Sequence, residues 1–397
     1  MELHRTNYRI LWGSPLPPTH SGVADYAAEL LPALADCTGV RVLEPPDWNP
    51  PDHWPASLEM VPGDTPPEKD EVVLLHLGNN PHHLWLLPRL RSNSCVVVLH
   101  DAVLHHLLVE STSDSTGVGP LLETELVLAH GSAGASLARA RNAGHHGRLD
   151  PFLFPARRAF LRKARAVVVH SDWAASVLAR EFPELTVGMV ALTVADPQPV
   201  DREASCAALG IDPEETVLMH LGFLSLEKGL EEILTGVAAA ARMGIDLRFV
   251  VVGEGRGEAL MKRVAEDLGL GDRVRVTGWL APEIFAKIPA AADLGVVLRT
   301  PSAGETSAAA LRFLACGVPV AMGGGRQFLE WPEAAAPRLT PGPSAAADLA
   351  RLLGEVRDEA FSARKLAARE VYEVSHRPET VAAQLIDFLT GLGACTE

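Results

Sequence analysis

Residues 294–322 read LGVVLRTPSAGETSAAALRFLACGVPVAM and pass from a strand pattern through a loop and a helix pattern into a second strand pattern. The valine- and leucine-rich run Leu294–Leu298 is typical of a strand buried on both faces, and Ala308–Cys316 is typical of a helix. Strand, helix and strand in succession form the repeating unit of a parallel sheet. The stretch therefore predicts an α/β fold.

The same alternation extends over almost the whole chain. Further helical patterns lie at Val23–Leu34 and Leu230–Met243. Between such patterns stand short apolar runs bounded by Gly, Pro, Asp or Ser, as expected for buried parallel strands. The strands predicted in this way are Tyr8–Trp12, Val72–His76, Cys95–Leu99, Ala166–His170, Thr216–His220, Leu247–Val252, Arg273–Thr277, Leu294–Leu298 and Val318–Met322.

The length of 397 residues and the hydrophobic content of 47% indicate more than one buried core. The polar segment Thr193–Glu203 contains two prolines and no apolar periodicity, so it is predicted to be a linker. We expect an N-terminal domain at 1–195 and a second domain at 204–375. Both would be α/β domains facing each other across a cleft, with ligands beyond the carboxyl ends of the strands.

The net charge of −15 argues against a nucleic-acid partner, which needs a basic surface. The five cysteines are scattered and never form a CxxC pair, so they are expected to be reduced thiols. The first residues carry charges and do not resemble a secretory signal. No stretch reaches the roughly 18 apolar residues that a transmembrane segment needs. The expected location is cytoplasmic.

In the opening stretch, the helix pattern begins at Gly304–Ser307. Free amides and the positive end of the helix dipole make a helix N-terminus a site for a diphosphate. The hydroxyls of Thr306 and Ser307 and the guanidinium of Arg299 would add donors. Glu305 is a carboxylate beside this predicted anion site, and ordinary helix capping explains it equally well.

Two more glycine-bearing loops follow strand patterns. After Gly222 a polar loop leads to Lys228, whose ammonium could bind a phosphate, although a solvated lysine at the start of a helix is the more common case. The sequence VVGEG places Gly253 and Glu254 after a strand. It lacks the complete GxGxxG pattern, so it gives little support to NAD binding.

Two elements of the first half could face a ligand. Ser21 and Gly22 precede a helix whose first turn holds Asp25 and Tyr26, and a surface turn explains them equally well. His100–Asp101 comes just after a buried strand, where ligands are met in parallel sheets. A histidine there could orient hydroxyls or shuttle protons, and a histidine satisfied by backbone carbonyls is the equal alternative.

The histidine doublets at 82–83, 105–106 and 145–146 match no HExxH or Cys/His metal pattern, and no DxD occurs. We therefore expect neither a metal nor a cofactor. The segment Arg139–Arg165 is strongly basic. A solvated helix face is the favoured explanation, and a docking surface for a phosphate-bearing acceptor or a peripheral membrane contact is the alternative.

Taken together, these motifs resemble the retaining nucleotide-sugar glycosyltransferases of the GT-B fold, in particular a GETS variant of glycosyltransferase family 4. The resemblance runs nearly from end to end. It rests on SGVADYAAELLPAL, HLGNNPHH, VVVLHDAVLHHLL, RAVVVHSDWAASVL, LGFLSLEKGLEEIL, VVGEG, GETSAAALRFLACGVPV and GRQFLEWPE in that order. It implies two Rossmann-like domains, a donor site in the second, and a final helix at 376–397 that crosses back to the first.

The resemblance also implies roles for the residues singled out above. Lys228 and Arg299 would bind the diphosphate of an NDP-sugar (a UDP- or GDP-sugar first), Glu305 the donor sugar, and His100 and Asp101 would lie at the reacting centre. The remaining donor-binding residues would be Gly222, Phe223, Ser225, Gly253, Glu254, Gly304, Thr306, Ser307 and Arg312, and the acceptor side would hold Ser21, Gly22, Asp25 and Tyr26. Such enzymes usually need no metal, and the departing phosphate is commonly assigned the role of base.

Two positions depart from the family pattern. The loop after Gly222 has no arginine before Lys228, and Arg312 stands where the family has a ribose-binding glutamate. Either Arg312 or Glu330 would then meet the ribose. The acceptor, a hydroxyl compound, is not readable from the sequence. Alternatives to transfer are a protein that binds a nucleotide or partner with weak catalysis, and a GT-B epimerase or cyclitol-coupling enzyme.

Overall fold

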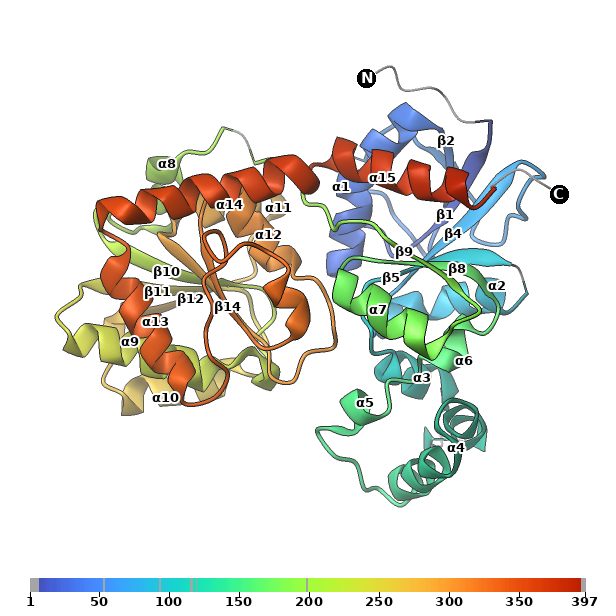
Figure 1. Ribbon diagram of the computed structural model, residues 1–397, viewed down its shortest axis with the longest axis horizontal. Coiled ribbons are helices and arrows are strands. Elements are labelled where there is room, and N and C mark those ends of the chain that lie inside the picture. The colour runs from blue at the N-terminus through green and yellow to red at the C-terminus, as the bar shows by residue number, and fades with distance from the viewer. Residues whose placement is uncertain are drawn as a thin grey trace. The chain divides into compact units, whose positions relative to one another are not determined.

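The computed structural model describes residues 7–52, 54–92, 94–114, 117–118, 120–197 and 199–393. The chain forms two compact units (Figure 1). The first comprises the chain up to Thr193, the short segment Ala303–Thr306 and the chain from Pro378 onward. The second comprises Val194–Ser302 and Ser307–Arg377. Each unit is described by itself below.

The first unit is built on a parallel sheet of seven strands in the order β3-β2-β1-β4-β5-β8-β9. Every residue of β5 is buried, and β1 and β4 are buried except at their first residue, as expected for a sheet covered on both faces. The strands are β1 (Arg9–Gly13), β2 (Gly39–Leu43), β3 (Glu59–Val61), β4 (Glu71–Leu77), β5 (Cys95–Leu99), β8 (Ala164–Val169) and β9 (Thr186–Met189).

Helices of the first unit connect these strands. They are α1 (Gly22–Cys37), η1 (Pro81–Leu86), α2 (Leu87–Ser92), α3 (His105–Thr112), α4 (Pro120–Asn142), α5 (Asp150–Leu153), α6 (Arg157–Leu161), α7 (Asp172–Glu181) and α15 (Pro378–Gly391). The last of them, α15, packs beside α1 (Figure 1). The hydroxyl of Tyr8 donates to the carbonyl of Ile386 at 3.2 Å, and Gln384 Oε1 accepts from the amide of Ala191 at 3.0 Å. These bonds fix α15 to the sheet of the first unit.

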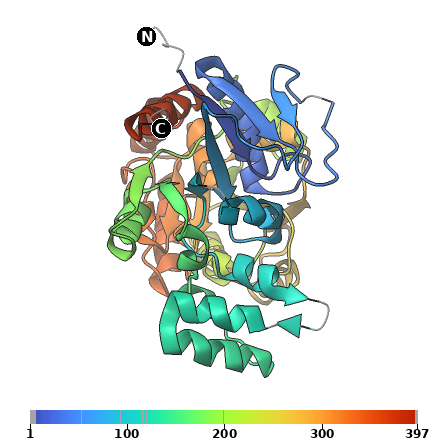
Figure 2. The same ribbon diagram turned by 90° about the vertical axis from the view of Figure 1, so that its right-hand side faces the viewer.

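The connection after α3 extends outward from the sheet. It begins with a small antiparallel pair, β6 (Ser113–Asp114) and β7 (Gly117–Val118). Within α4, Gly131 has φ 60° and ψ −141°, which is not helical, so α4 consists of two helical segments. Figure 2 shows these segments folded back on each other. Glycine is required there because a left-handed φ is strained for any residue with a Cβ.

The second unit is built on a parallel sheet of five strands in the order β12-β11-β10-β13-β14. The strands are β10 (Thr216–Leu221), β11 (Leu247–Val252), β12 (Val274–Gly278), β13 (Leu294–Leu298) and β14 (Val320–Gly323). Its helices are α8 (Arg202–Leu209), α9 (Leu230–Arg242), α10 (Glu258–Asp267), α11 (Pro282–Phe285), α12 (Ala308–Ala315), α13 (Ser344–Glu355) and α14 (Ser362–Ser375), and its single turns are η2 (Leu226–Lys228), η3 (Gly271–Arg273), η4 (Ile288–Ala291), η5 (Arg326–Leu329) and η6 (Glu359–Phe361). Figure 1 shows α9, α10 and α13 on one face and α8, α12 and α14 on the other.

The predicted α/β architecture is confirmed, with parallel sheets in both units. All nine predicted strands are present, within two residues of their expected ends. The sequence pattern missed β2, β3 and β9 of the first sheet and the short pair of β6 and β7. In β2 the cause is Arg41, which interrupts the apolar run; its guanidinium is buried and lies 2.6 Å from Glu68 and 3.2 Å from Glu71. A charged residue was therefore buried by pairing, which periodicity does not detect.

Candidate functional site

Three histidines form a hydrogen-bonded chain at the carboxyl edge of the first sheet. His76 lies near the end of β4, His100 follows β5 and His170 follows β8. Because β5 lies between β4 and β8, His100 lies between the other two rings. His76 Nδ1 is 3.0 Å from His100 Nε2, and His100 Nδ1 is 3.2 Å from His170 Nε2. Ligands of parallel sheets bind at this edge.

A single carbonyl places one proton of this chain. His170 Nδ1 lies 2.9 Å from the carbonyl oxygen of Val190, which can only accept, so His170 carries its proton on Nδ1. With a neutral His170, its Nε2 accepts from His100 Nδ1–H, and His100 Nε2 accepts from His76 Nδ1–H. With a protonated His170, its Nε2–H donates to His100 Nδ1 and the bond between His100 and His76 reverses. His76 Nε2 is buried and has no hydrogen-bond partner among the described residues.

The electrostatics keep His76 and His100 neutral. Burial lowers the pKa of His76 and of His100 well below the ordinary value, and repulsion by His170 lowers both pKa values further. Both ring nitrogens of His100 are engaged by other histidines. In this conformation His100 therefore offers neither nitrogen to a ligand, and it is not poised as a proton shuttle near neutral pH.

Tyr26 packs against the histidine chain. Its ring centroid lies 4.9 Å from that of His100, edge to face, and 5.5 Å from that of His170. Burial raises the pKa of the Tyr26 hydroxyl. Of the other predicted acceptor-side residues, Ser21 caps α1 by accepting from the amide of Val23 at 3.3 Å, and Gly22 and Asp25 are exposed. The structure thus brings Tyr26 together with His100, whereas Asp25 lies on the outer side of α1.

The loops after β4 and β5 are bonded to each other. The carboxylate of Asp101 accepts from the amide of Asn79 at 2.8 Å, and Asn79 Oδ1 accepts from the amide of His106 at 2.8 Å. His83 Nδ1 donates to the carbonyl of His76 at 2.9 Å, and burial lowers the pKa of His83 to about 4. The motifs HLGNNPHH and HDAVLHH, predicted separately, therefore form one structure.

The segment Ala303–Thr306 is a loop and not the start of a helix, so that expectation is wrong. The helix α12 begins at Ala308, and Ser307 caps it by accepting from the amide of Ala310 at 3.2 Å. Gly304 has φ +79°, and a Cβ there would lie 2.2 Å from the ring of Trp173, so its backbone cannot be helical and only glycine fits. Thr306 Oγ1 donates to the carbonyl of His170 at 2.9 Å. The partly buried Glu305 lies between these two anchored residues.

In the second unit, the loops after β10 and β11 lie backbone against backbone. The amide of Gly222 donates to Val252 and the amide of Leu224 donates to Glu254, each at 2.9 Å. Gly253 has φ +141°, and a Cβ on it would lie 2.2 Å from the carbonyl oxygen of Gly222. The glycine in VVGEG is therefore needed for this close approach, which accounts for the motif without a dinucleotide.

Two cationic residues flank the carboxyl ends of β10 and β13. Lys228 lies in η2 with 9% of its surface exposed, and Arg299 directly follows β13. His220, near the end of β10, has its pKa lowered to about 3 by burial first, then by repulsion from Lys228 and Arg299. Both cations therefore lie near His220. A pair of cations at this edge suits an anionic ligand such as a diphosphate.

Other predicted donor residues are placed less favourably. Phe223 is 58% exposed and Ser225 precedes η2 without a side-chain capping bond. Arg312 is buried on α12, with its guanidinium 5.3 Å from the ring centre of Phe285. Glu330 is exposed at the end of η5. Their roles toward a nucleotide stay predictions.

The basic segment Arg139–Arg165 is largely engaged in pairs within its own unit. Arg157 binds Glu181 at 2.6 Å, Arg162 binds Glu125 at 3.2 Å, and Arg165 donates to the carbonyl of Leu392 at 2.8 Å. Similar contacts involve Arg139 with Glu123, Arg141 with Asp150, Arg158 with the ring of Phe182, and Lys163 with the carbonyl of Arg91. These contacts support an internal role over a docking surface.

Within the described ranges, no group of three His, Cys, Asp or Glu side chains is arranged to hold a metal ion. The same part of the chain contains no helix long and apolar enough to span a membrane. Four cysteines there, Cys37, Cys95, Cys206 and Cys316, are buried free thiols, and Cys395 lies outside the described residues.

The sequence reasoning did not single out His76 and His170. Both stood in motifs that were noted, each at the end of a buried strand, and that position was the available signal. Their contact with His100 depends on the order of strands in the sheet, which the sequence does not state.

Comparisons with known proteins agree with this geometry. Residues 201–330 match the family described as glycosyl transferases group 1. A 2-deoxystreptamine glucosyltransferase of Streptomyces kanamyceticus is 30% identical over 217 residues, which are 53% of this chain and 55% of that relative. Three other curated relatives are matched over 28–58% of their length.

Solved structures are similar over nearly the whole chain. Sucrose-phosphate synthase from Thermosynechococcus elongatus has a TM-score of 0.68 at 18% identity, covering 98% of this chain and 100% of that one. Anabaena HepE, solved in complex with UDP, has a TM-score of 0.60 at 16% identity, covering 97% and 100%. Likeness at this identity establishes the fold. The chain has the GT-B fold, and its residues 201–330 match the glycosyl transferases group 1 family.

Proposed function

We propose that this chain is a retaining, metal-independent glycosyltransferase that moves a sugar from an NDP-sugar to a hydroxyl acceptor. The observation that carries the proposal is the pair of cations, Lys228 and Arg299, at the carboxyl edge of the group 1 domain. The donor diphosphate would bind there. Fixed cations then stabilise the negative charge that develops on the departing diphosphate. The UDP bound to Anabaena HepE favours a UDP-sugar over a GDP-sugar.

The histidine chain bears on the proposed chemistry. A neutral His100 with both nitrogens engaged is poorly suited to remove a proton from the acceptor. In the proposed reaction the bond from the sugar C1 to the phosphate oxygen breaks, and the acceptor oxygen forms its bond to C1 on the same face. The acceptor proton passes to the departing phosphate oxygen. His100 and Asp101 would then shape the site, and Glu305 would bind the donor sugar.

For the acceptor, we propose a cyclic polyol that carries amino groups. The relative from Streptomyces kanamyceticus is named for transfer to 2-deoxystreptamine, a cyclitol of this class. Ser21, Gly22, Asp25 and Tyr26 are the acceptor-side residues that the family resemblance implies.

A second candidate is a GT-B protein that binds a nucleotide without transferring sugar. The position of Arg312 favours it: the family has a ribose-binding glutamate there, and this chain has a guanidinium buried over Phe285. Calorimetry with UDP-, GDP-, ADP- and TDP-sugars, together with a hydrolysis and transfer assay, separates the two candidates. Tight binding of a donor with no turnover on any acceptor would support the second.

The donor site is tested by Lys228→Ala. Losing one charge-assisted contact to the diphosphate should weaken donor binding about 10- to 150-fold. The matched control is Lys262→Ala, because Lys262 is 61% exposed and pairs with Glu258 on the surface of α10. Donor binding and turnover should be unchanged in the control. Wild-type affinity in a folded Lys228→Ala protein, checked by its melting temperature, would contradict the assignment.

A further inference from the structure

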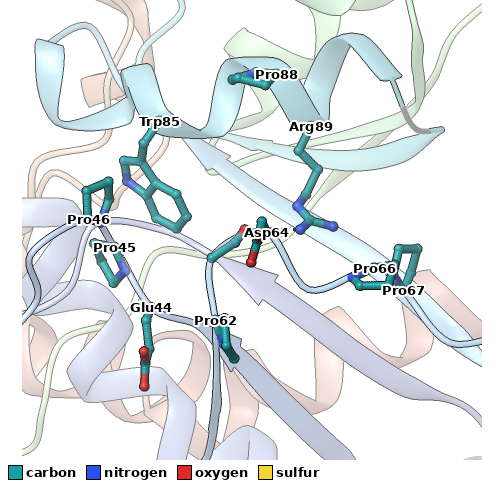
Figure 3. Close-up of a pocket in the computed structure, with 11 residues that line it drawn as sticks. Glu44, Pro45, Pro46, Pro62, Asp64, Pro66, Pro67, Trp85, Pro88 and Arg89 are labelled. Atoms are coloured by element: carbon teal, nitrogen blue, oxygen red, sulfur yellow. Dashed lines mark hydrogen bonds between the residues drawn. The ribbon is translucent and has the colours of Figure 1, made fainter.

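A cavity of about 830 Å³ in the first unit is lined by none of the site residues predicted from the sequence. It is formed by the loops that follow β2 and β3, Glu44–Pro46 and Pro62–Pro67, together with Trp85 of η1 and Arg89 of α2. Figure 3 shows these side chains around the cavity. Because β2 and β3 are parallel to β4 and β5, the cavity opens at the same edge of the sheet as the histidine chain.

The walls of the cavity are rigid. A proline has a fixed φ and loses little conformational entropy when a ligand binds, so a site lined by prolines is largely preformed. The lining prolines are Pro45, Pro46, Pro62, Pro66, Pro67 and Pro88. Arg89 ties the second loop by donating from Nη2 to the carbonyls of Gly63 and Thr65, at 3.1 and 2.7 Å. The amide of Glu44 donates to the carbonyl of Val61 at 2.9 Å, which joins the two loops.

The lining chemistry suits a ring with polar substituents. Trp85 borders the cavity with its indole ring, and Figure 3 shows the carboxylate of Asp64 between that ring and the guanidinium of Arg89. An aromatic face stacks on the C–H face of a saturated ring, and carboxylates accept from hydroxyl and ammonium groups at its rim. The Trp85 Nε1 atom is buried without a hydrogen-bond partner among the described residues.

The charge of the lining favours a cation over an anion. The lining holds two carboxylates, Glu44 and Asp64, and one guanidinium; Arg89 already donates to two carbonyls and lies next to Asp64. An ammonium group gains from both carboxylates and from the face of Trp85. A phosphate would meet both carboxylates as like charges.

We propose that this cavity is the acceptor subsite and binds a cyclic polyol that carries an amino group. Trp85 stacks on the ring, and Asp64 and Glu44 bind the ammonium and neighbouring hydroxyls. That the bound polyol is the acceptor rests on the proposed function. Binding of the polyol to the cavity requires no nucleotide.

The test is calorimetry on the whole chain without nucleotide, with three probes: 2-deoxystreptamine, uncharged myo-inositol and anionic myo-inositol 1-phosphate. The amino compound should bind most tightly. Asp64→Asn should weaken its binding about 10-fold or more and change that of myo-inositol little, since only the former loses a charged partner. Trp85→Ala should weaken both. Asp52→Asn, an exposed carboxylate outside the cavity, is the matched control and should change nothing.

Three results would overturn the proposal. They are no binding of 2-deoxystreptamine at millimolar concentration, wild-type affinity for 2-deoxystreptamine in both Asp64→Asn and Trp85→Ala, and tighter binding of myo-inositol 1-phosphate than of 2-deoxystreptamine. Since Asp64 lines an open cavity, the melting temperature of Asp64→Asn should stay close to wild type. Trp85 also packs against the core of the first unit, so Trp85→Ala should melt lower, and its melting curve must show that it is folded at the assay temperature. Donor binding at Lys228 is measured separately. If the wild-type chain binds 2-deoxystreptamine but transfers no sugar to it, the proposed function is contradicted and the binding site in the cavity is not.

Discussion

Acidification should destabilise the first unit through His83, which is fully buried and donates to the carbonyl of His76. Burial lowers its pKa from the ordinary value of 6.5 to about 4. A folded-state pKa below the unfolded value means that the unfolded chain binds the proton first. The stability contributed by a neutral His83 is therefore present above pH 6.5 and is lost as the pH falls from 6.5 toward 4.

The magnitude follows from this difference. At pH 5.0 the unfolded histidine is 1.5 pH units below its pKa, and protonation stabilises it by about 2 kcal/mol. The folded His83 gains almost nothing, because pH 5.0 is still above its own pKa of about 4. The free energy of unfolding should therefore fall by about 2 kcal/mol from this residue alone between pH 7.5 and 5.0. A domain is typically stable by about 5–15 kcal/mol, so the loss is measurable.

The assay is urea unfolding of the whole chain at pH 7.5 and 5.0, followed by tryptophan fluorescence. Trp12, Trp48, Trp54, Trp85 and Trp173 belong to the first unit, so the signal reports mainly on it.

The decisive variant is His83→Gln, whose amide can donate to the same carbonyl but does not titrate. Between pH 7.5 and 5.0, the free energy of unfolding of this variant should fall by about 2 kcal/mol less than that of the wild type, which corresponds to about 1 M in the urea midpoint. This difference is expected whatever the stability of the variant at pH 7.5. His82→Gln is the matched control, since His82 is exposed, and it should leave the pH dependence as in the wild type. If His83→Gln and wild type lose the same stability on acidification, the reasoning is refuted.

Three further outcomes are expected. Gly253→Ala should cost about 2 kcal/mol or more in chemical unfolding of the second unit, because its Cβ would lie 2.2 Å from the Gly222 carbonyl oxygen at a φ of +141°; a variant as stable as wild type would show that the two loops move apart freely. Cys95, whose thiol pKa is raised to about 12 by burial, should resist iodoacetamide at pH 8 and react only after unfolding, as mass spectrometry of the labelled peptides would show. Asp293→Ala should lower stability by about 3 kcal/mol or more, because the buried carboxylate accepts from Arg202 at 3.1 Å; calorimetric melting measures this, and a shift under about 2 °C would contradict it.

The fold could be predicted from the sequence because buried parallel strands are continuous apolar runs, and β5 and β13 are of this kind. The residue at which α12 begins could not be predicted in this way. Gly304, which precedes this helix, has a φ of +79°, and a Cβ there would meet the ring of Trp173, a residue far away in the chain. A local pattern carries no information on such a contact.

Single residues of the candidate site could be predicted from the sequence. Lys228, Arg299 and His100 each follow a predicted strand, and that rule found them. The hydrogen bonds from both His100 nitrogens to other histidines could not be predicted from the sequence. They depend on which strands are neighbours in the sheet and on the position of the Val190 carbonyl. The cavity beside Trp85 was missed because its walls are prolines in loops, which sequence reasoning treats only as interruptions.

The attachment of α15 to α1 has a consequence for how the chain is made. The first unit is discontinuous: the ribosome must translate the whole second unit after Thr193 before the residues of α15 emerge. At about 5–20 residues per second this delay is roughly 10–40 s. During that time the apolar side of α1 and the hydroxyl of Tyr8 lack the surface that later covers them. The part of the chain that is synthesised first is therefore the last to complete its fold, and a chaperone that shields nascent apolar surface would act on α1.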